Sequence, residues 1–282
     1  MVNFNGTIFQ DNEQKISIHN RGLNYGDAVF ETLKVVASKV YFLEDHYFRL
    51  MASMRILRME IPMNFTMEFF EQEILKTVEA YNVTSEAYRV KVFVNRKTGG
   101  KYTPETNDID FLISVETLGI SFYTTNKTTY EVELFKDYYI PANLLSTLKT
   151  TSKVVNVLGS IYAKENNYQN CLLLNDKKQV IEALNGNIFL IKENLIITPP
   201  ISDGCLRGII RKQIIDICKL SKDYTLTEES ISPFDLQKAD ELFITNVIVG
   251  IQSISRFRKK EYTSRVAKDL LQKLNVKARL SL

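Results

Sequence analysis

Histidine and cysteine are scarce in this 282-residue chain, which has two of the first and three of the second. The two histidines are His19 and His46. With so few, we expect neither a Ser-His-Asp catalytic triad nor a histidine-bound metal site. Cys171, Cys205 and Cys218 are odd in number and form no Cys-x-x-Cys pair, so neither a disulfide framework nor a zinc site is expected. We therefore expect no metal and three buried thiols in a reducing compartment.

The chain also lacks a strong charge of either sign. It has 36 basic and 33 acidic residues, and no basic run is long enough for a nucleic-acid-binding surface. The basic cluster at residues 256–260 is most simply a solvated turn between strands. No apolar run approaches the roughly 20 residues of a membrane span, and residues 1–6 lack the features of a signal sequence. These absences predict a cytoplasmic protein that binds neither nucleic acid nor membrane.

The hydrophobic content of 45% is sufficient for well-formed cores, and the length favours two domains or one large one. The first part mixes strands and helices: a hairpin at residues 2–9, helices at 44–57 and 67–81, and strands at 88–94 and 110–115. Arg49 lies off the apolar stripe of its helix and would be a surface residue on an isolated helix. The polar stretch 119–129 is the best candidate linker.

The second part is rich in short apolar runs that read as strands. These runs lie at residues 172–174, 180–182, 187–191 and 195–197, with another at 241–246 after a short helix. Helical spacing predicts a helix at 208–220 and a closing helix at 264–274.

Lys149 lies at a junction within the second part. Apolar residues at 144, 145 and 148 predict a strand end, and those at 154, 157, 158 and 161 predict a helix with one buried face. Thr151 and Ser152 could cap this helix at its N-terminus. A lysine held there and partly desolvated could act as a nucleophilic amine, although most lysines before helices are solvated surface residues.

Four elements that lie far apart in the sequence could together form a site for a phosphorylated, carbonyl-bearing cofactor. Lys149 could form a Schiff base, and the turn at Gly208 offers backbone N–H groups at a helix start, where anions bind. Arg49 could contact a phosphate, and Glu182, an acid among apolar strand residues, could hold a ring nitrogen protonated. Pyridoxal phosphate needs this set of an amine, a phosphate site and a carboxylate. Each element taken singly has a more common structural explanation.

Three stretches carry a specific pattern. Residues 24–31 place a glycine–aspartate turn before a Phe-Glu pair, and residues 46–53 read H-x-x-R-L-x-x-S. Residues 180–211 read V-x-E-x-x-x-x-N-I-F, then T-P-P, then L-x-G-I-I-R. In order and spacing the chain resembles the class IV aminotransferases, also called fold type IV pyridoxal-phosphate enzymes. This family includes branched-chain and D-amino acid aminotransferases and aminodeoxychorismate lyases.

The resemblance implies a role for particular residues. Lys149 corresponds to the lysine that forms the Schiff base with pyridoxal 5'-phosphate, and Glu182 to the partner of its ring nitrogen. Arg49 and the backbones of Ile209 and Ile210 correspond to phosphate-binding groups.

Further positions either extend the resemblance or depart from it. Asn246-Val247 aligns with another phosphate-binding loop of the family. Ile210 stands where many transaminases have threonine, which removes one side-chain phosphate contact. Thr151 and Ser152 stand where many relatives have asparagine.

The resemblance also implies an architecture. We expect a two-domain α+β fold, with a small N-terminal α/β domain at residues 1–120 and a larger, barrel-like C-terminal domain at 121–282. The cofactor should lie between the domains. Family members are commonly homodimers, so a homodimer is expected.

The reaction is the remaining choice. Residues 243–254 resemble the lyase pattern T-N-S-L-x-G-I-x-P-V more than the transaminase pattern T-G/S-T-x-x-E-I-T-P-V, and residues 99–102 resemble the lyase segment G-G-R-G-Y. This favours a 4-amino-4-deoxychorismate lyase that gives 4-aminobenzoate and pyruvate. A branched-chain or D-amino acid aminotransferase, acting on a small amino substrate, is the alternative. A non-catalytic relative is disfavoured because Lys149, Glu182 and Arg49 are all present.

Overall fold

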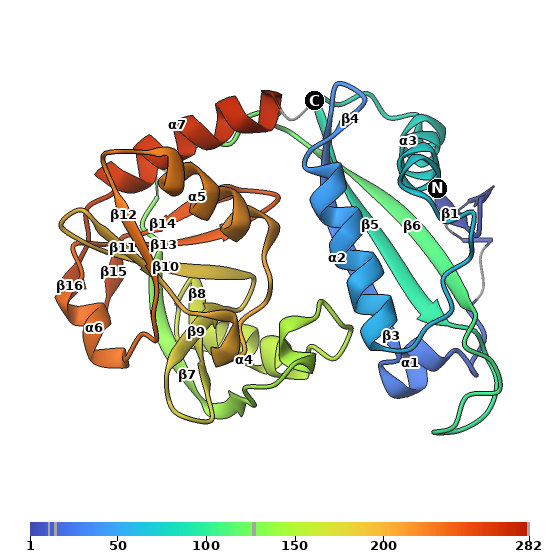
Figure 1. Cartoon of the computed structure of the whole chain (residues 1–282), viewed down its shortest axis with the longest axis horizontal. Coiled ribbons are helices and arrows are strands. Elements are labelled where there is room, and N and C mark those ends of the chain that lie inside the picture. Colours follow the sequence, from blue (N-terminus) through green and yellow to red (C-terminus); the bar gives the residue numbers. More distant parts are fainter. Residues whose placement is uncertain (11, 14–15, 126–127, 281–282) are drawn as a thin grey trace. The chain divides into compact units, whose positions relative to one another are not determined.

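The computed structural model describes residues 1–10, 12–13, 16–125 and 128–280, and it contains two compact units (Figure 1). Unit 1 consists of Met1–Ser121, Lys149–Ser152 and Ala278–Leu282, and unit 2 of Phe122–Leu148 and Lys153–Lys277. Helices and sheets occur in both, which confirms the predicted α+β class. The candidate linker contains the change of unit after Ser121, while its residues 126 and 127 lie outside the described part of the chain.

Unit 1 is built on a six-stranded sheet in which the paired strands are antiparallel. The strand order is β2-β1-β6-β5-β3-β4. The predicted hairpin at the N-terminus is confirmed, with its turn at Asn5-Gly6. The strands are β1 (Val2–Phe4), β2 (Thr7–Phe9), β3 (Ala28–Val36), β4 (Lys39–Val40), β5 (Ala87–Arg96) and β6 (Ile109–Leu118).

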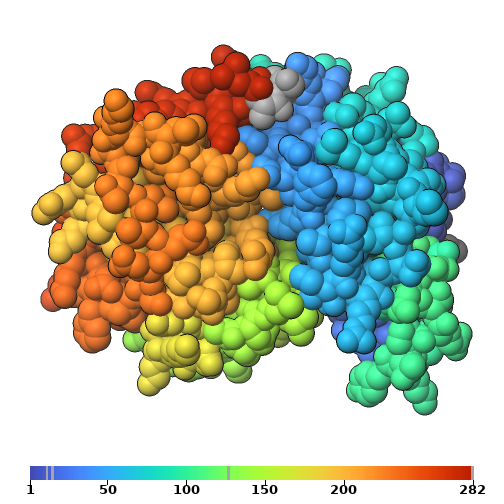
Figure 2. Space-filling view, viewed as in Figure 1, coloured from blue at the N-terminus to red at the C-terminus, as the bar shows by residue number. Residues whose placement is uncertain are grey.

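Two long helices, α2 (Leu43–Ile56) and α3 (Met67–Tyr81), pack on this sheet and share its core. Both were predicted by apolar spacing, and both begin with favourable first-turn groups: α2 has two acids there, and the Thr66 side chain caps α3. A short helix, α1 (Arg21–Tyr25), precedes β3. Figure 2 shows α2 and the chain after it, in blue, at the molecular surface.

Unit 2 contains a mixed ten-stranded sheet with the order β12-β11-β10-β9-β8-β7-β15-β16, and β13 adds to β10 and to β14. The basic cluster is only in part the solvated turn that was predicted: residues 258–259 form the turn, whereas Arg256 and the buried Phe257 form β15 and Lys260 begins β16. The strands are β7 (Glu131–Ile140), β8 (Asn170–Asn175), β9 (Val180–Ala183), β10 (Gly186–Lys192), β11 (Leu195–Thr198), β12 (Thr225–Glu228), β13 (Glu241–Asn246), β14 (Gly250–Ile254), β15 (Arg256–Phe257) and β16 (Lys260–Glu261).

The remaining helices are α4 (Val154–Glu165), α5 (Ile209–Leu220), α6 (Pro233–Lys238) and α7 (Arg265–Leu280), with 3₁₀ turns η1 (Leu145–Thr147) and η2 (Ile201–Asp203). The predicted closing helix was too short, because α7 continues beyond residue 274. The predicted apolar face of α5 is buried. None of the described helices is both long and apolar enough to cross a membrane.

The chain around Lys149 differs from the sequence-based prediction. Residues 145–147 form η1 instead of a strand end. Helix α4 is present, but Lys153 occupies its N-cap position without a side-chain hydrogen bond, so Thr151 and Ser152 do not cap it. Its apolar face was predicted to be buried, yet it is exposed: Val154 70%, Val157 55%, Ile161 48% and Leu158 37%. Apolar spacing identified the helix but not what covers it.

The three cysteines are buried and unbridged, which confirms the prediction of buried thiols. Burial raises the pKa of Cys171 and Cys205 to about 12 and that of Cys218 to about 11. Within the described residues, no group of three or more His, Cys, Asp or Glu side chains could hold a metal ion.

Candidate functional site

The segment that carries Lys149 runs along the free edge of β3 in unit 1. The N–H of Phe30 donates to the carbonyl of Lys149 at 2.9 Å, and the N–H of Thr151 donates to that of Ala28 at 3.2 Å. The backbone of Lys149 is therefore positioned by strand pairing rather than by a helix terminus.

The amine of Lys149 lies over an aromatic ring. Its Nζ is 4.5 Å from the ring centroid of Phe30, and Nζ of Lys91 is 5.1 Å from the same centroid. A cation over an aromatic face gains about 0.5–2 kcal/mol. The ring therefore helps to hold the Lys149 side chain in one direction.

Arg49 is anchored by a buried carboxylate. Its Nε and Nη2 donate to the two oxygens of Glu31 at 2.7 and 2.5 Å, and His46 Nδ1 lies 2.7 Å from the same carboxylate. The Arg49 side chain is only 11% exposed, unlike the surface residue that an isolated helix would suggest. Burial alone would raise the pKa of Glu31, but Arg49 and the hydrogen bonds from His46 and Arg49 lower it to about 2.

His46 completes this group as a neutral ring. Burial lowers its pKa, and Arg49 and Lys149 lower it further against the opposing effect of Glu31. Because the ionised Glu31 can only accept, we assign the proton to Nδ1. Nε2 is then a buried acceptor without a hydrogen-bond partner among the described residues.

Glu31→Gln is expected to destabilise the protein by about 3 kcal/mol at neutral pH, because Arg49 and His46 lose a buried charge partner. The lowered pKa stabilises the fold above the ordinary value of 4.5, and this contribution is lost as the pH falls towards about 2. The difference in free energy of unfolding between wild type and variant, measured by denaturant titration, should therefore become smaller as the pH falls over that range. Glu116→Gln, which breaks an exposed pair with Arg89, is the control and should cost less than about 1 kcal/mol. Equal stability of Glu31→Gln and wild type at pH 7 would contradict the assignment.

In unit 2, three adjacent strands align polar residues. Glu182 on β9 is the register partner of Asn187 on β10, which in turn is the partner of Thr245 on β13. The N–H of Leu206 donates to Glu182 Oε2 at 2.9 Å, and Nδ2 of Asn187 donates to the carbonyl of Leu206 at 2.8 Å. Both backbone polar groups of Leu206 are thus fixed to the sheet just before α5.

Helix α5 begins directly after this anchor. Gly208 is its N-cap residue, and no side chain caps the helix there. A Cβ on Gly208 would lie 1.9 Å from the Oδ1 atom of Asn187, so a larger residue there would force the Asn187 side chain to shift. The first helical residues, Ile209 and Ile210, bring backbone N–H groups to an uncapped helix start, which is an arrangement that binds anions such as phosphate.

The turn between β13 and β14 lies in the same unit. Oδ1 of Asn246 accepts hydrogen bonds from the N–H groups of Ile248 and Val249 at 3.0 and 3.1 Å. The hydroxyl of Tyr123 donates to the carbonyl of Val247 at 3.0 Å. The Asn246 side chain therefore stabilises this turn through hydrogen bonds with the turn's own backbone.

The sequence-predicted site residues fall into two sets: Lys149 and Arg49 in unit 1, and Glu182, Ile209, Ile210, Asn246 and Val247 in unit 2. Sequence reasoning gave no role to Glu31, His46 or Asn187. All three stand within the quoted motifs, but nothing in the spacing indicates their partners.

Comparison with known proteins identifies the family. The sequence profile described as amino-transferase class IV matches residues 28–257, most of the chain. The chain belongs to the class IV aminotransferase family. Class IV aminotransferases use pyridoxal phosphate, and this chain is an enzyme of that family.

Relatives of this class IV enzyme cover nearly its whole length. A Methanocaldococcus jannaschii protein provisionally named a branched-chain-amino-acid aminotransferase is 28% identical over 98% of this chain and 94% of its own. The branched-chain aminotransferase of Thermoproteus uzoniensis, solved with norvaline, has a TM-score of 0.87 at 22% identity, covering 96% of this chain and 92% of its own. A Legionella pneumophila protein provisionally named a 4-amino-4-deoxychorismate lyase has a TM-score of 0.82 at 23% identity, covering 93% and 95%. Both solved structures share the fold.

Proposed function

We propose that this class IV enzyme is a 4-amino-4-deoxychorismate lyase, which releases 4-aminobenzoate and pyruvate. The observation that carries the proposal is the β13–β14 turn. Its two distinctive residues are Asn246, whose side chain closes the turn, and Gly250, at φ +70°. A Cβ on Gly250 would come within 2.6 Å of the Tyr123 ring. Position 250 carries glutamate in the transaminase pattern. Here it favours glycine, because its φ is positive and because a side chain would collide with Tyr123. This supports the lyase pattern.

The residues present fit pyridoxal phosphate. When bound, the cofactor supplies an electron-accepting ring that stabilises negative charge on the carbon beside the substrate nitrogen. The uncapped start of α5 offers Ile209 and Ile210 N–H groups to its phosphate, and the Asn246-Val247 turn would add to this site. Arg49 would share its guanidinium between Glu31 and the phosphate.

Two side chains would carry the chemistry. Lys149 would hold the cofactor through its amine and, once displaced by substrate, take the proton from the carbon that bears nitrogen. Glu182 would keep a proton on the ring nitrogen.

The test offers the purified holoenzyme two substrate sets. Aminodeoxychorismate alone should give 4-aminobenzoate and pyruvate in equal amounts, with no keto acid required. Amino acids with 2-oxoglutarate should give little glutamate. Rapid glutamate formation from branched-chain amino acids or D-alanine, without turnover of aminodeoxychorismate, would overturn the lyase assignment.

A transaminase is the second candidate, because the 28%-identical M. jannaschii relative carries an aminotransferase name. The two reactions share their first steps at Lys149 and differ only afterwards, so the site residues above serve either. Absence of any spectral change across a wide panel of amines would instead favour a non-catalytic relative.

We also propose that the enzyme is a homodimer in the cytoplasm. Exposed apolar residues just before η1, in η1 and in α4 support an interface between copies, because such groups are favourably removed from water: Leu144, Leu145, Val154, Val157 and Ile161. The buried thiols are consistent with a reducing compartment. Sedimentation at micromolar concentration should give the dimer mass, whereas a fully active monomer would contradict the proposal.

A further inference from the structure

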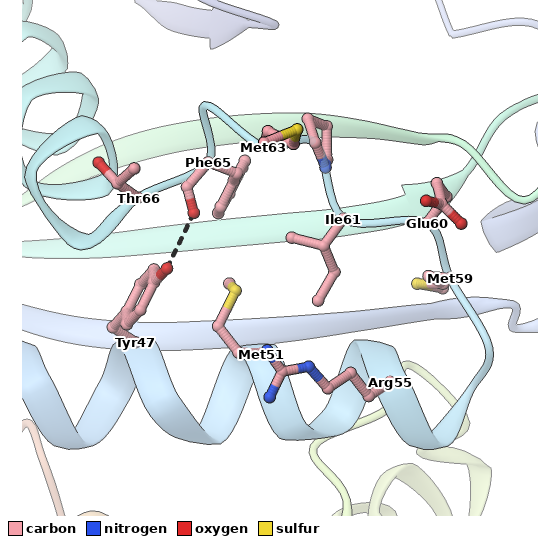
Figure 3. A pocket seen from close by; sticks show the side chains of 10 residues that line it. Tyr47, Met51, Arg55, Met59, Glu60, Ile61, Met63, Phe65 and Thr66 are labelled. Carbon is pink, nitrogen blue, oxygen red and sulfur yellow. Dashed lines mark hydrogen bonds between the residues drawn. The ribbon is translucent and has the colours of Figure 1, made fainter.

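A pocket of about 400 Å³ lies in unit 1 between α2 and the chain that follows it (Figure 3). Residues Tyr47, Met51 and Arg55 line it from α2, and residues 59–63, 65 and 66 line its other side. None of these residues belongs to the proposed cofactor site. Its volume is at the lower end of the range of about 300–1,000 Å³ that is typical of small-molecule sites.

Backbone hydrogen bonds hold the outer wall of the pocket in place. The N–H of Glu60 donates to the carbonyl of Asn107 at 2.7 Å, and that of Phe65 donates to Pro62 at 2.9 Å. Figure 3 shows the hydroxyl of Tyr47 donating across one end to the carbonyl of Phe65, at 2.9 Å. A ligand would therefore enter a space that is already formed, with little ordering of the chain.

The floor of the pocket is apolar. Met51, Met59 and Phe65 line it and are only 4%, 5% and 4% exposed. Thioether side chains adapt to apolar groups of different shape. The floor thus favours a small aliphatic or aromatic group.

Two opposite charges line the same pocket. The side chains of Arg55 and Glu60 are exposed, and neither forms an ion pair with another described residue. A ligand with a single charge would match only one of them, whereas a zwitterion matches both. We propose that this pocket binds an α-amino acid with an apolar side chain. Its carboxylate meets Arg55, its ammonium group meets Glu60, and its side chain rests on the methionine floor.

The experiment titrates L-leucine into holoenzyme that carries ¹³C-methyl methionine. The chain has six methionines, and the signals of Met51 and Met59 should shift while that of Met1 does not. Arg55→Gln and Glu60→Gln should each weaken this binding about tenfold or more, because each removes a charged hydrogen-bond partner. Arg58→Gln and Glu79→Gln, which change charges of unit 1 that do not line the pocket, should leave it unaltered.

The methionine signals separate this site from the cofactor site, whose visible absorbance reports events at Lys149. A changed absorbance with unmoved Met51 and Met59 signals would overturn the pocket proposal and leave the proposed function intact. Unaltered leucine binding in both Arg55→Gln and Glu60→Gln would also overturn it. So would 4-methylpentanoate, which lacks the ammonium group, if it bound as tightly as leucine. If rising protein concentration alone shifted the same signals, the surface would be an interface between copies instead.

Discussion

Lys149→Ala is expected to lower turnover by about 10⁴-fold or more, because the variant loses the group that holds the cofactor and moves the proton. The purified wild-type protein should be yellow, and the variant should lose the visible absorbance of the bound cofactor. The fold should survive, since the segment is held by its backbone: Phe30 N–H still donates to the carbonyl at position 149. Turnover, the visible spectrum and the melting temperature together test the assignment.

Lys153→Ala is the matched control. It removes the next lysine along the chain, which sits at the N-cap position of α4 and makes no side-chain capping hydrogen bond. This variant should keep both its colour and its turnover. A Lys149→Ala protein with an unaltered spectrum and normal turnover would sink the proposal that Lys149 is the reacting amine.

The elements that the sequence predicts well are those whose signals are local. Helices α2 and α3 of unit 1 follow from apolar spacing, and the hairpin follows from the turn at Asn5-Gly6. The same spacing in α4 predicted a buried face that is exposed, because periodicity records which side is apolar and not what lies against it. The two-residue strands β15 and β16 are too short to carry a pattern.

In the candidate site, too, local motifs could be predicted from the sequence, whereas the contacts between elements could not. Motif spacing singles out Arg49 and Glu182, but it does not show how Arg49 is held. Its partner Glu31 lies on another element, 18 positions earlier in the chain, and 15 positions before His46, which shares the same carboxylate. On α2 alone, Arg49 lies off the buried stripe, and its burial reflects its pairing with a carboxylate partner on β3. Likewise, Asn187 matters because register places it beside Glu182 and Leu206, which no single strand reveals.

Glu182→Gln is expected to retain the cofactor and to lower turnover by on the order of 10²-fold or more. Glutamine has nearly the same shape, and its amide oxygen can still accept the hydrogen bond from Leu206 N–H, so the loop before α5 should keep its position. A neutral amide cannot stabilise a proton on the ring nitrogen as a carboxylate does. Negative charge on the substrate carbon is then poorly stabilised, and the loss should appear in kcat rather than in cofactor affinity.

Glu229→Gln provides the matched control for this substitution. It changes the same side chain at an exposed position in unit 2, where the hydrogen bond given for Glu229 within the described part of the chain is from its backbone N–H to the carbonyl of Thr198. Its kcat and melting temperature should equal those of the wild type. If Glu182→Gln also kept near-normal kcat with bound cofactor, the carboxylate would serve only to anchor Leu206. If instead it lost the cofactor altogether, the loop before α5 would depend on the charge of Glu182 as well as on its shape.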